Sequence, residues 1–182
     1  MTKKPYSTDE KDPELIKNWF DDQQQALNVF RDEVIATAKK SATLLPIKFQ
    51  QLEPAELINY FNESEREIEH LFSFDVIAAT EAILRLDFQD RVTGKRRSEI
   101  TRQLRTLQKQ KGDYISLEED ILQTWKDFNP REKKRFSDLI GLLKYRHWLA
   151  HGRCWVPNLG REYNFKLTYF ITKEVTDFIK SH

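Results

Sequence analysis

A ten-residue segment, 146–155, gathers side chains that can act on a phosphodiester. It reads Arg-His-Trp-Leu-Ala-His-Gly-Arg-Cys-Trp, with two arginines, two histidines and two tryptophans. Histidine gains and loses a proton near neutral pH, while arginine keeps its charge and offers forked donors to phosphate oxygens. Attack by a ribose 2′-hydroxyl on its neighbouring phosphate needs an acid or base and a cation, and requires no metal. The segment is therefore a candidate active site for RNA cleavage.

The spacing of Arg146 and His151 leaves their partnership open. Side chains five residues apart on an ideal α-helix point about 140° away from each other. A loosened last turn at Gly152 can bring His151 round to Arg146, and a second copy of the chain can complete the cluster from outside. The sequence does not choose between these two routes.

Other roles for the same residues need to be weighed. His147 and His151 have a spacing that can chelate zinc, but Trp148 stands where a zinc protease helix carries glutamate. Cys154 has no acid–base partner fixed by spacing, which favours a small packed thiol. Arg146 and His151 can also form a hydrogen-bonded helix end, since cations favour helix C-termini. We expect neither a metal nor a cofactor.

Composition is that of an ordinary globular domain. The chain has 182 residues, 39% of them hydrophobic, and its 30 Lys and Arg residues nearly balance 29 acids. Net charge therefore does not by itself indicate a nucleic-acid binder. No run approaches the roughly 20 apolar residues that cross a bilayer, and residues 1–12 lack the apolar core of a secretory signal. We expect one domain over 1–182, with residues 1–12 flexible, a cytoplasmic location and no membrane partner.

Apolar residues recur mostly at helical spacing, and few glycines interrupt them, so we predict an all-α helical bundle. Asp12-Pro13 opens a first helix that should stop before Pro46. A short helix near Pro54 and a long one ending near Val92 should follow. Further starts are marked by the pair Ser116 and Glu119 and by Asn129-Pro130. The last of these helices carries the segment 146–155, and its inward residues should be Phe136, Leu139, Ile140, Leu143 and Ala150.

The region beyond the motif changes character. Gly152 is expected to cap the motif helix. Residues 155–170 mix one proline, one glycine and alternating aromatics, which predicts a short irregular or β-like segment before a last helix that follows Thr172. We expect Trp148 and Trp155 to pack, and we assign His70 and His182 to the core or surface.

A basic run occupies residues 91–111, with eight cations against one acid. Ile100, Leu104 and Leu107 give the run a narrow apolar seam, which indicates an amphipathic helix. Two interpretations stay open: a solvated helix face, or a track for the RNA backbone whose affinity falls with salt. The candidate RNA contacts are Arg96, Arg97 and Arg102 of this run, and Arg153 of the motif.

Residues 146–151, Arg-His-Trp-Leu-Ala-His, resemble the signature of the HEPN ribonuclease superfamily: an arginine, a polar residue, three or more residues and a histidine. Continued through Gly152, Arg153 and Trp155, the string looks like a bacterial branch rich in Arg-His-Trp-Leu-Ala-His-Gly-Arg. Residues 81–88, Glu-Ala-Ile-Leu-Arg-Leu-Asp-Phe, resemble the long inner helix of that branch. The resemblance covers these two blocks, but not residues 1–74 or the basic run.

The resemblance implies a HEPN-like bundle in which two motif helices pair across a two-fold axis and form one cleft for RNA. It implies metal-independent cleavage that leaves a 2′,3′-cyclic phosphate. Arg146 would orient and neutralise the phosphate, and His151 would be the principal acid or base. His147 would fill the polar position beside the arginine, and Glu81 would hold Arg146 or a histidine.

Proteins of this superfamily are toxins, defence nucleases and RNA-processing factors. The resemblance therefore implies a homodimeric toxin or defence effector, whose partners are RNA and an antitoxin or regulatory protein. The alternative is a non-catalytic dimerisation or RNA-binding module on the same fold. Retention of Arg146, His147 and His151 favours the enzyme.

Overall fold

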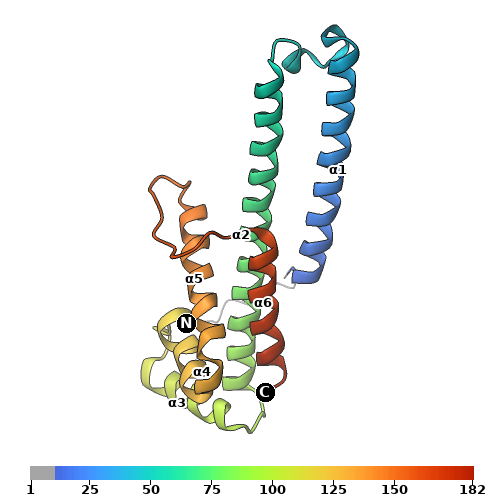
Figure 1. The fold of residues 1–182 in the computed structure, drawn as a ribbon. Helices are drawn as coiled ribbons and strands as arrows, with labels where there is room; N and C mark the ends of the chain where they lie inside the picture. Colours follow the sequence, from blue (N-terminus) through green and yellow to red (C-terminus); the bar gives the residue numbers. More distant parts are fainter. Residues whose placement is uncertain (1–10) are drawn as a thin grey trace.

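The computed structural model describes residues 11–182, which form six α-helices and contain no strand (Figure 1). The all-α prediction is therefore confirmed. The prediction that residues 1–12 are flexible falls almost entirely on residues outside the described range. No described helix has the length and apolar character needed to cross a membrane. The helices are α1 (Pro13–Lys40), α2 (Pro54–Thr93), α3 (Glu99–Lys111), α4 (Leu122–Phe128), α5 (Lys133–Ala150) and α6 (Phe165–Lys180).

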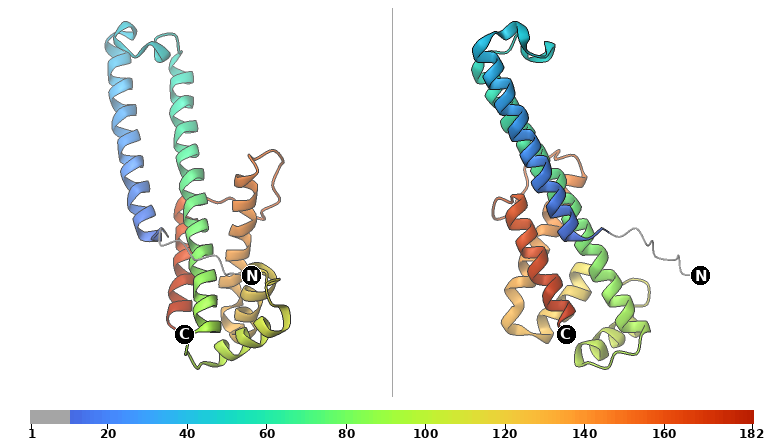
Figure 2. Two further views of the ribbon diagram at one scale, coloured as in Figure 1. Left: turned by 180° about the vertical axis from the view of Figure 1, so that it is seen from behind. Right: turned by 90° about the vertical axis from the view of Figure 1, so that its right-hand side faces the viewer.

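A long antiparallel hairpin, made of α1 and the first half of α2, projects from the rest of the molecule; we call it the arm (Figures 1 and 2). Asp12 starts α1 as predicted, because its Oδ1 accepts a hydrogen bond from the Glu14 N–H at 3.0 Å. Two 3-10 turns, Ala42–Leu44 and Ile47–Phe49, join the two helices at the tip. A small apolar core of its own holds the tip together: Val34, Leu45, Phe49, Leu57 and Phe61.

α2 is one continuous helix of 40 residues, so the prediction of a short helix followed by a long one is wrong. After Pro54 the segment has no glycine or proline that could interrupt it. A reciprocal capping box between Glu53 and Glu56 closes its N-terminus. At 1.5 Å per residue the helix is about 60 Å long. It therefore runs from the tip of the arm through the whole bundle.

The main core lies where the second half of α2 packs against α5 and α6, with α3 and α4 at the far end (Figure 1). Phe136, Leu139 and Leu143 of α5 are buried as predicted. Ala150 is exposed, against the prediction, because it is the last residue of α5 and lies beyond the packed interface. Full burial of a large apolar side chain contributes about 1.5–3 kcal/mol, so Phe136, Leu139 and Leu143 each stabilise the bundle by an amount of this order.

The apolar seam predicted in the basic run is confirmed, since Ile100 and Leu104 of α3 have no exposed surface. Arg91, at the start of the run, is also fully buried. Its Nε donates to Asp87 at 2.6 Å, one terminal nitrogen donates to the Ile179 carbonyl at 3.0 Å, and its guanidinium lies over the Trp125 ring. Arg91 therefore belongs to the core and is unavailable to RNA.

Two helix starts differ from the sequence pattern. Ser116 caps its helix as predicted, but the reciprocal acceptor is Asp120, which takes the Ser116 N–H at 2.9 Å, and a π turn, Leu117–Ile121, precedes α4. The last helix starts at Phe165 and not after Thr172. Its N-cap is Asn164, whose side chain accepts the Leu167 N–H at 2.9 Å. Residues 151–164 are irregular and contain no strand.

Candidate active site

The motif helix ends in a Schellman turn, and this confirms the role predicted for Gly152. Gly152 adopts φ +69°, a left-handed conformation that glycine reaches without a steric cost. Arg153 follows with φ +57°. Three backbone hydrogen bonds close the turn: His151 to His147 at 3.1 Å, Gly152 to Leu149 at 3.2 Å and Arg153 to Trp148 at 3.1 Å. The turn carries the chain out of the helix axis immediately after His151.

Two exposed imidazoles stand side by side at this helix end. The ring centroids of His147 and His151 are 4.3 Å apart, as expected for residues one turn apart. The Trp155 ring lies about equally far from both, at 5.9 and 6.0 Å. The Trp148 indole N–H fixes the returning loop by donating to the Trp155 carbonyl at 2.8 Å. A substrate can therefore reach both imidazoles from solvent.

Arg146 points away from the imidazoles and toward α2. One of its terminal nitrogens lies 3.5 Å from Glu81 Oε2, and Arg85 contacts the other oxygen of the same carboxylate at 2.9 Å. The Arg146 Nε is buried and has no hydrogen-bond partner among the described residues. The structure thus brings Arg146 and Glu81 together, one of the two pairings expected for Glu81.

Arg146 and His151 do not meet within one chain. The last turn of α5 is regular, since the His151 N–H donates to the His147 carbonyl. No contact between the Arg146 and His151 side chains is found in residues 11–182, so the loosened turn that could have joined them is not present. Completion of the cluster by a second copy stays a prediction.

Arg153 is tied to α2. Its guanidinium forms a bidentate ion pair with Glu67, at 2.5 and 3.0 Å, and one of its nitrogens lies 2.8 Å from His70 Nδ1. The hydrogen bond from Arg153 lowers the pKa of Glu67, and burial, followed by the charge of Arg153, lowers the pKa of His70. Arginine only donates, so His70 Nδ1 accepts and the ring proton resides on Nε2. As an RNA contact, Arg153 would have to leave this pair.

The three candidate contacts in the basic run lie far from the motif. Arg96 pairs with Asp87 and Asp90, Arg102 pairs with Glu99, and Arg97 is exposed and has no ionic partner in the described part of the chain. α3 and the loop after α5 are at opposite ends of α5, which is about 27 Å long (Figure 1). The structure therefore does not bring these arginines together with His151.

The remaining motif residues with predicted roles are the two histidines, Cys154 and the two tryptophans. No group of three His, Cys, Asp or Glu side chains that could hold a metal ion occurs in the described range, although His147 and His151 are adjacent. Cys154 is exposed, so the prediction of a packed thiol is wrong. The turn at Gly152 is the cause, because it directs residue 154 away from the bundle. Trp148 packs against the main core as predicted, whereas 42% of Trp155 remains exposed.

Sequence reasoning gave His70 no role and did not single out Glu67. Both lie on α2, more than 80 residues from Arg153 in sequence, and the structure joins them to the motif through Arg153. The only available signal was their spacing of three, which puts them on one face of a helix.

Comparison of the chain with models of protein families, with curated proteins and with solved structures finds no match. The reaction that the site can carry out is therefore inferred from the arrangement of its own side chains. That geometry places the guanidinium of Arg146, held by Glu81, and two accessible imidazoles at a single helix end.

Proposed function

We propose that this chain is a metal-independent endoribonuclease of the HEPN type, which cleaves RNA by attack of a 2′-hydroxyl and leaves a 2′,3′-cyclic phosphate. The observation that carries the proposal is the end of α5, where Glu81 holds Arg146 while His147 and His151 stand exposed. These are the groups that an in-line attack on phosphorus uses. The resemblance of residues 146–155 to the superfamily motif supports the same conclusion.

The reaction needs only proton transfers and charge neutralisation. An imidazole removes the proton of the 2′-hydroxyl as its oxygen attacks phosphorus, and a second imidazole protonates the 5′-oxygen as the old P–O bond breaks. His151 is the principal group in these transfers. Arg146 neutralises the charge that develops on the phosphate oxygens, where a forked donor is most effective. Each positioned acid or base contributes about 10²–10⁴ to the rate.

A second copy of the chain completes the proposed cleft. Within one chain Arg146 faces Glu81 and His151 faces Trp155, so a two-fold axis is needed to bring both types of group to one phosphate. The loop after α5 stands out from the bundle (Figure 2) and carries the exposed apolar residue Val156, of which 94% is accessible. A toxin or defence role in the cytoplasm, with an antitoxin or regulatory partner, is part of the same proposal.

A non-catalytic module is the competing proposal. It is favoured by the engagement of Arg146 with Glu81, which occupies part of the guanidinium that a phosphate would need. Such a module would bind RNA or dimerise without cutting. It predicts RNA binding by the full chain with no change in the length of the RNA.

Incubation of the full chain with total cellular RNA in EDTA tests both proposals. Wild type and His182→Ala, which alters a histidine outside the motif, should cut RNA and leave cyclic phosphate ends, while His151→Ala should not. RNA that carries 2′-O-methyl groups should resist. If the RNA stays intact in the presence of wild type, the ribonuclease proposal is rejected and the non-catalytic module remains. Cleavage that needs an added divalent metal would indicate metal chemistry at His147 and His151.

A further inference from the structure

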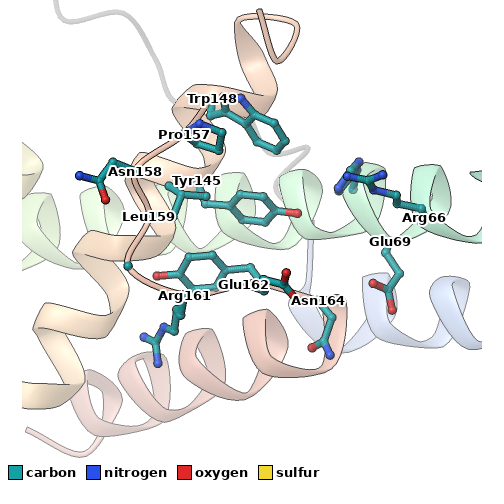
Figure 3. A pocket seen from close by; sticks show the side chains of 13 residues that line it. Arg66, Glu69, Tyr145, Trp148, Pro157, Asn158, Leu159, Arg161, Glu162 and Asn164 are labelled. Atoms are coloured by element: carbon teal, nitrogen blue, oxygen red, sulfur yellow. The ribbon is translucent and has the colours of Figure 1, made fainter. Parts of the chain in front are cut away.

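A cleft of about 700 Å³ adjoins the motif, bounded by α2, the last turns of α5 and the loop 157–164 (Figure 3). Its volume falls within the range of small-molecule sites. The cleft is distinct from the Arg146 and Glu81 contact, because neither residue lines it. The lining residues that matter here are Arg66, Glu69, His70, Tyr145, Trp148 and Tyr163.

One wall of the cleft is a stack of aromatic rings. Tyr145 lies between Trp148 and Tyr163, at centroid distances of 6.0 and 5.1 Å and interplanar angles of 23° and 19°. Tyr145 is buried, whereas Trp148 and Tyr163 keep part of their surface and line the cleft. Rings aligned in this way offer a flat face to a planar ligand.

Both outer rings are held before any ligand arrives. The Tyr163 hydroxyl approaches Gly141 of α5 so closely that a Cβ there would lie 2.4 Å from it. The Trp148 indole is fixed by its hydrogen bond to the Trp155 carbonyl at 2.8 Å. A prearranged wall lowers the entropic cost of stacking a ligand on it.

The opposite wall, on α2, is polar. Figure 3 shows Arg66 and Glu69 projecting from α2 across the cleft from Tyr145. Glu69 is half-buried and makes no hydrogen bond or ion pair with any described residue, and burial raises its pKa. His70 contributes an Nε2–H donor, because its Nδ1 already faces Arg153. An acceptor, a donor and a cation thus face an aromatic wall, which is the combination that reads the edge of an unstacked base.

The cleft and the imidazoles share one surface of the motif helix. Trp148 and His151, the C-cap of α5, are three residues apart, so their side chains are neighbours at the end of the helix. Trp155 links the cleft to the imidazoles. Its carbonyl accepts a hydrogen bond from the Trp148 indole, and its ring lies beside the ring of His151. A nucleotide bound in the cleft would therefore lie beside a phosphate bound at His151.

We propose that this cleft receives one unpaired nucleobase of the RNA strand, next to the phosphate at His151, and so determines where the strand is positioned. The proposal rests on the ribonuclease function above. The base lies against Trp148 or Tyr163, Glu69 and His70 meet its polar edge, and Arg66 faces its phosphate. Trp148, expected to serve packing alone, then has a second role.

The test uses the full chain carrying His151→Ala, so that bound RNA stays intact. Its affinity is measured for a short single-stranded RNA of mixed sequence, for the same strand with single abasic sites and for free nucleoside monophosphates. Loss of the bound base should weaken binding about 10-fold or more, as stacking on aromatic side chains does. Added Glu69→Gln should remove the dependence of affinity on base identity, and added Glu65→Gln, a matched change on an exposed neighbour, should retain it.

The outcomes separate this inference from the proposed function. Equal affinity for intact and abasic strands would overturn the base site even if wild type cuts RNA. A preference for free monophosphates over the strand would overturn its assignment to RNA. Base-dependent binding that Glu69→Gln removes would support the site even if wild type proves unable to cut.

Discussion

The guanidinium of Arg146 and the carboxylate of Glu81 lie 3.5 Å apart and join α5 to α2. Side-chain exposures of 32% and 19% place this pair at the edge of the bundle. Ion pairs that solvent can reach contribute at most about 1 kcal/mol to stability. The main effect of the contact is therefore on the direction of the Arg146 side chain.

Glu81→Gln should reduce RNA cleavage while leaving the fold intact. We expect a loss of about 10- to 100-fold, because displacement of a positioned group by about 1 Å has an effect of this size. Glu81→Asp should recover part of the activity. Arg85→Gln, which removes the other partner of Glu81, is the matched control and should stay near wild type. Equal rates for Glu81→Gln and wild type would show that the contact does not position Arg146.

Arg146→Ala and His151→Ala should each lower the rate of RNA cleavage by a factor of about 10²–10⁴ or more. Neither side chain packs in the core, so thermal melting should stay within a few degrees of wild type. Initial cleavage rates and melting curves on the same preparations test this. Unchanged cleavage by either variant would remove that residue from the catalytic assignment.

The active form should be a dimer, with a mass in light scattering near twice 21.8 kDa. A mixture of Arg146→Ala and His151→Ala chains should regain part of the activity that each lacks alone. In the mixed dimer the shared cleft still holds one Arg146 and one His151, from different chains. An active monomer, or no recovery in a mixture shown to form mixed dimers, would contradict the shared cleft.

Stability should fall as the pH drops below 6.5, through His70. Burial and the charge of Arg153 lower the pKa of His70, so the unfolded chain binds this proton more readily than the folded chain. The contribution of His70 to the free energy of unfolding is complete above its ordinary pKa of 6.5. It is lost as the pH falls through the folded-state pKa. The pKa of Glu67 is also lowered, so its contribution is lost only below its ordinary value of 4.5.

Urea unfolding at pH 7.5 and 5.5 measures this effect. His70→Gln should lose less stability than wild type between these two values. Glu69, whose raised pKa acts in the opposite direction, is present in both proteins and cancels in the comparison. The prediction fails if the two proteins show the same pH dependence.

Arg91→Ala should destabilise the bundle by about 3–5 kcal/mol, because it leaves Asp87 without its buried partner. For a chain of this size, 1 kcal/mol lowers the melting temperature by about 2–4 °C. Arg97→Ala, an exposed arginine of the same basic run, should change the stability by less than about 0.5 kcal/mol. Similar melting temperatures for the two variants would contradict the burial of Arg91.

Local signals predicted the elements that depend on local physics. Asp12 before Pro13, Gly152 after the motif helix and the seam of Ile100 and Leu104 each act within a few residues, and each is found as expected. The continuity of α2 and the start of α6 at Phe165 were missed, although each has a local cause. No glycine or proline follows Pro54 within α2, and the Asn164 side chain caps α6.

The site shows the same division. Spacing alone predicted the adjacency of His147 and His151, because it follows from the helical repeat. The contacts of Arg153 with Glu67 and His70, and the burial of Arg91 against Trp125, join residues far apart in the sequence. The sequence does not indicate these partners. In the basic run, for example, a buried arginine such as Arg91 has the same sequence context as a solvated one.

The length of α2 has a mechanical consequence. Glu67 and Glu81, which hold Arg153 and Arg146, are fourteen residues apart on the same unbroken helix, about 21 Å along its axis. Both contacts therefore belong to the same rigid element as the arm. In the proposed dimer, a tilt of α2 at the arm would move Arg146 and Arg153 together and would change how the two copies of α5 face each other.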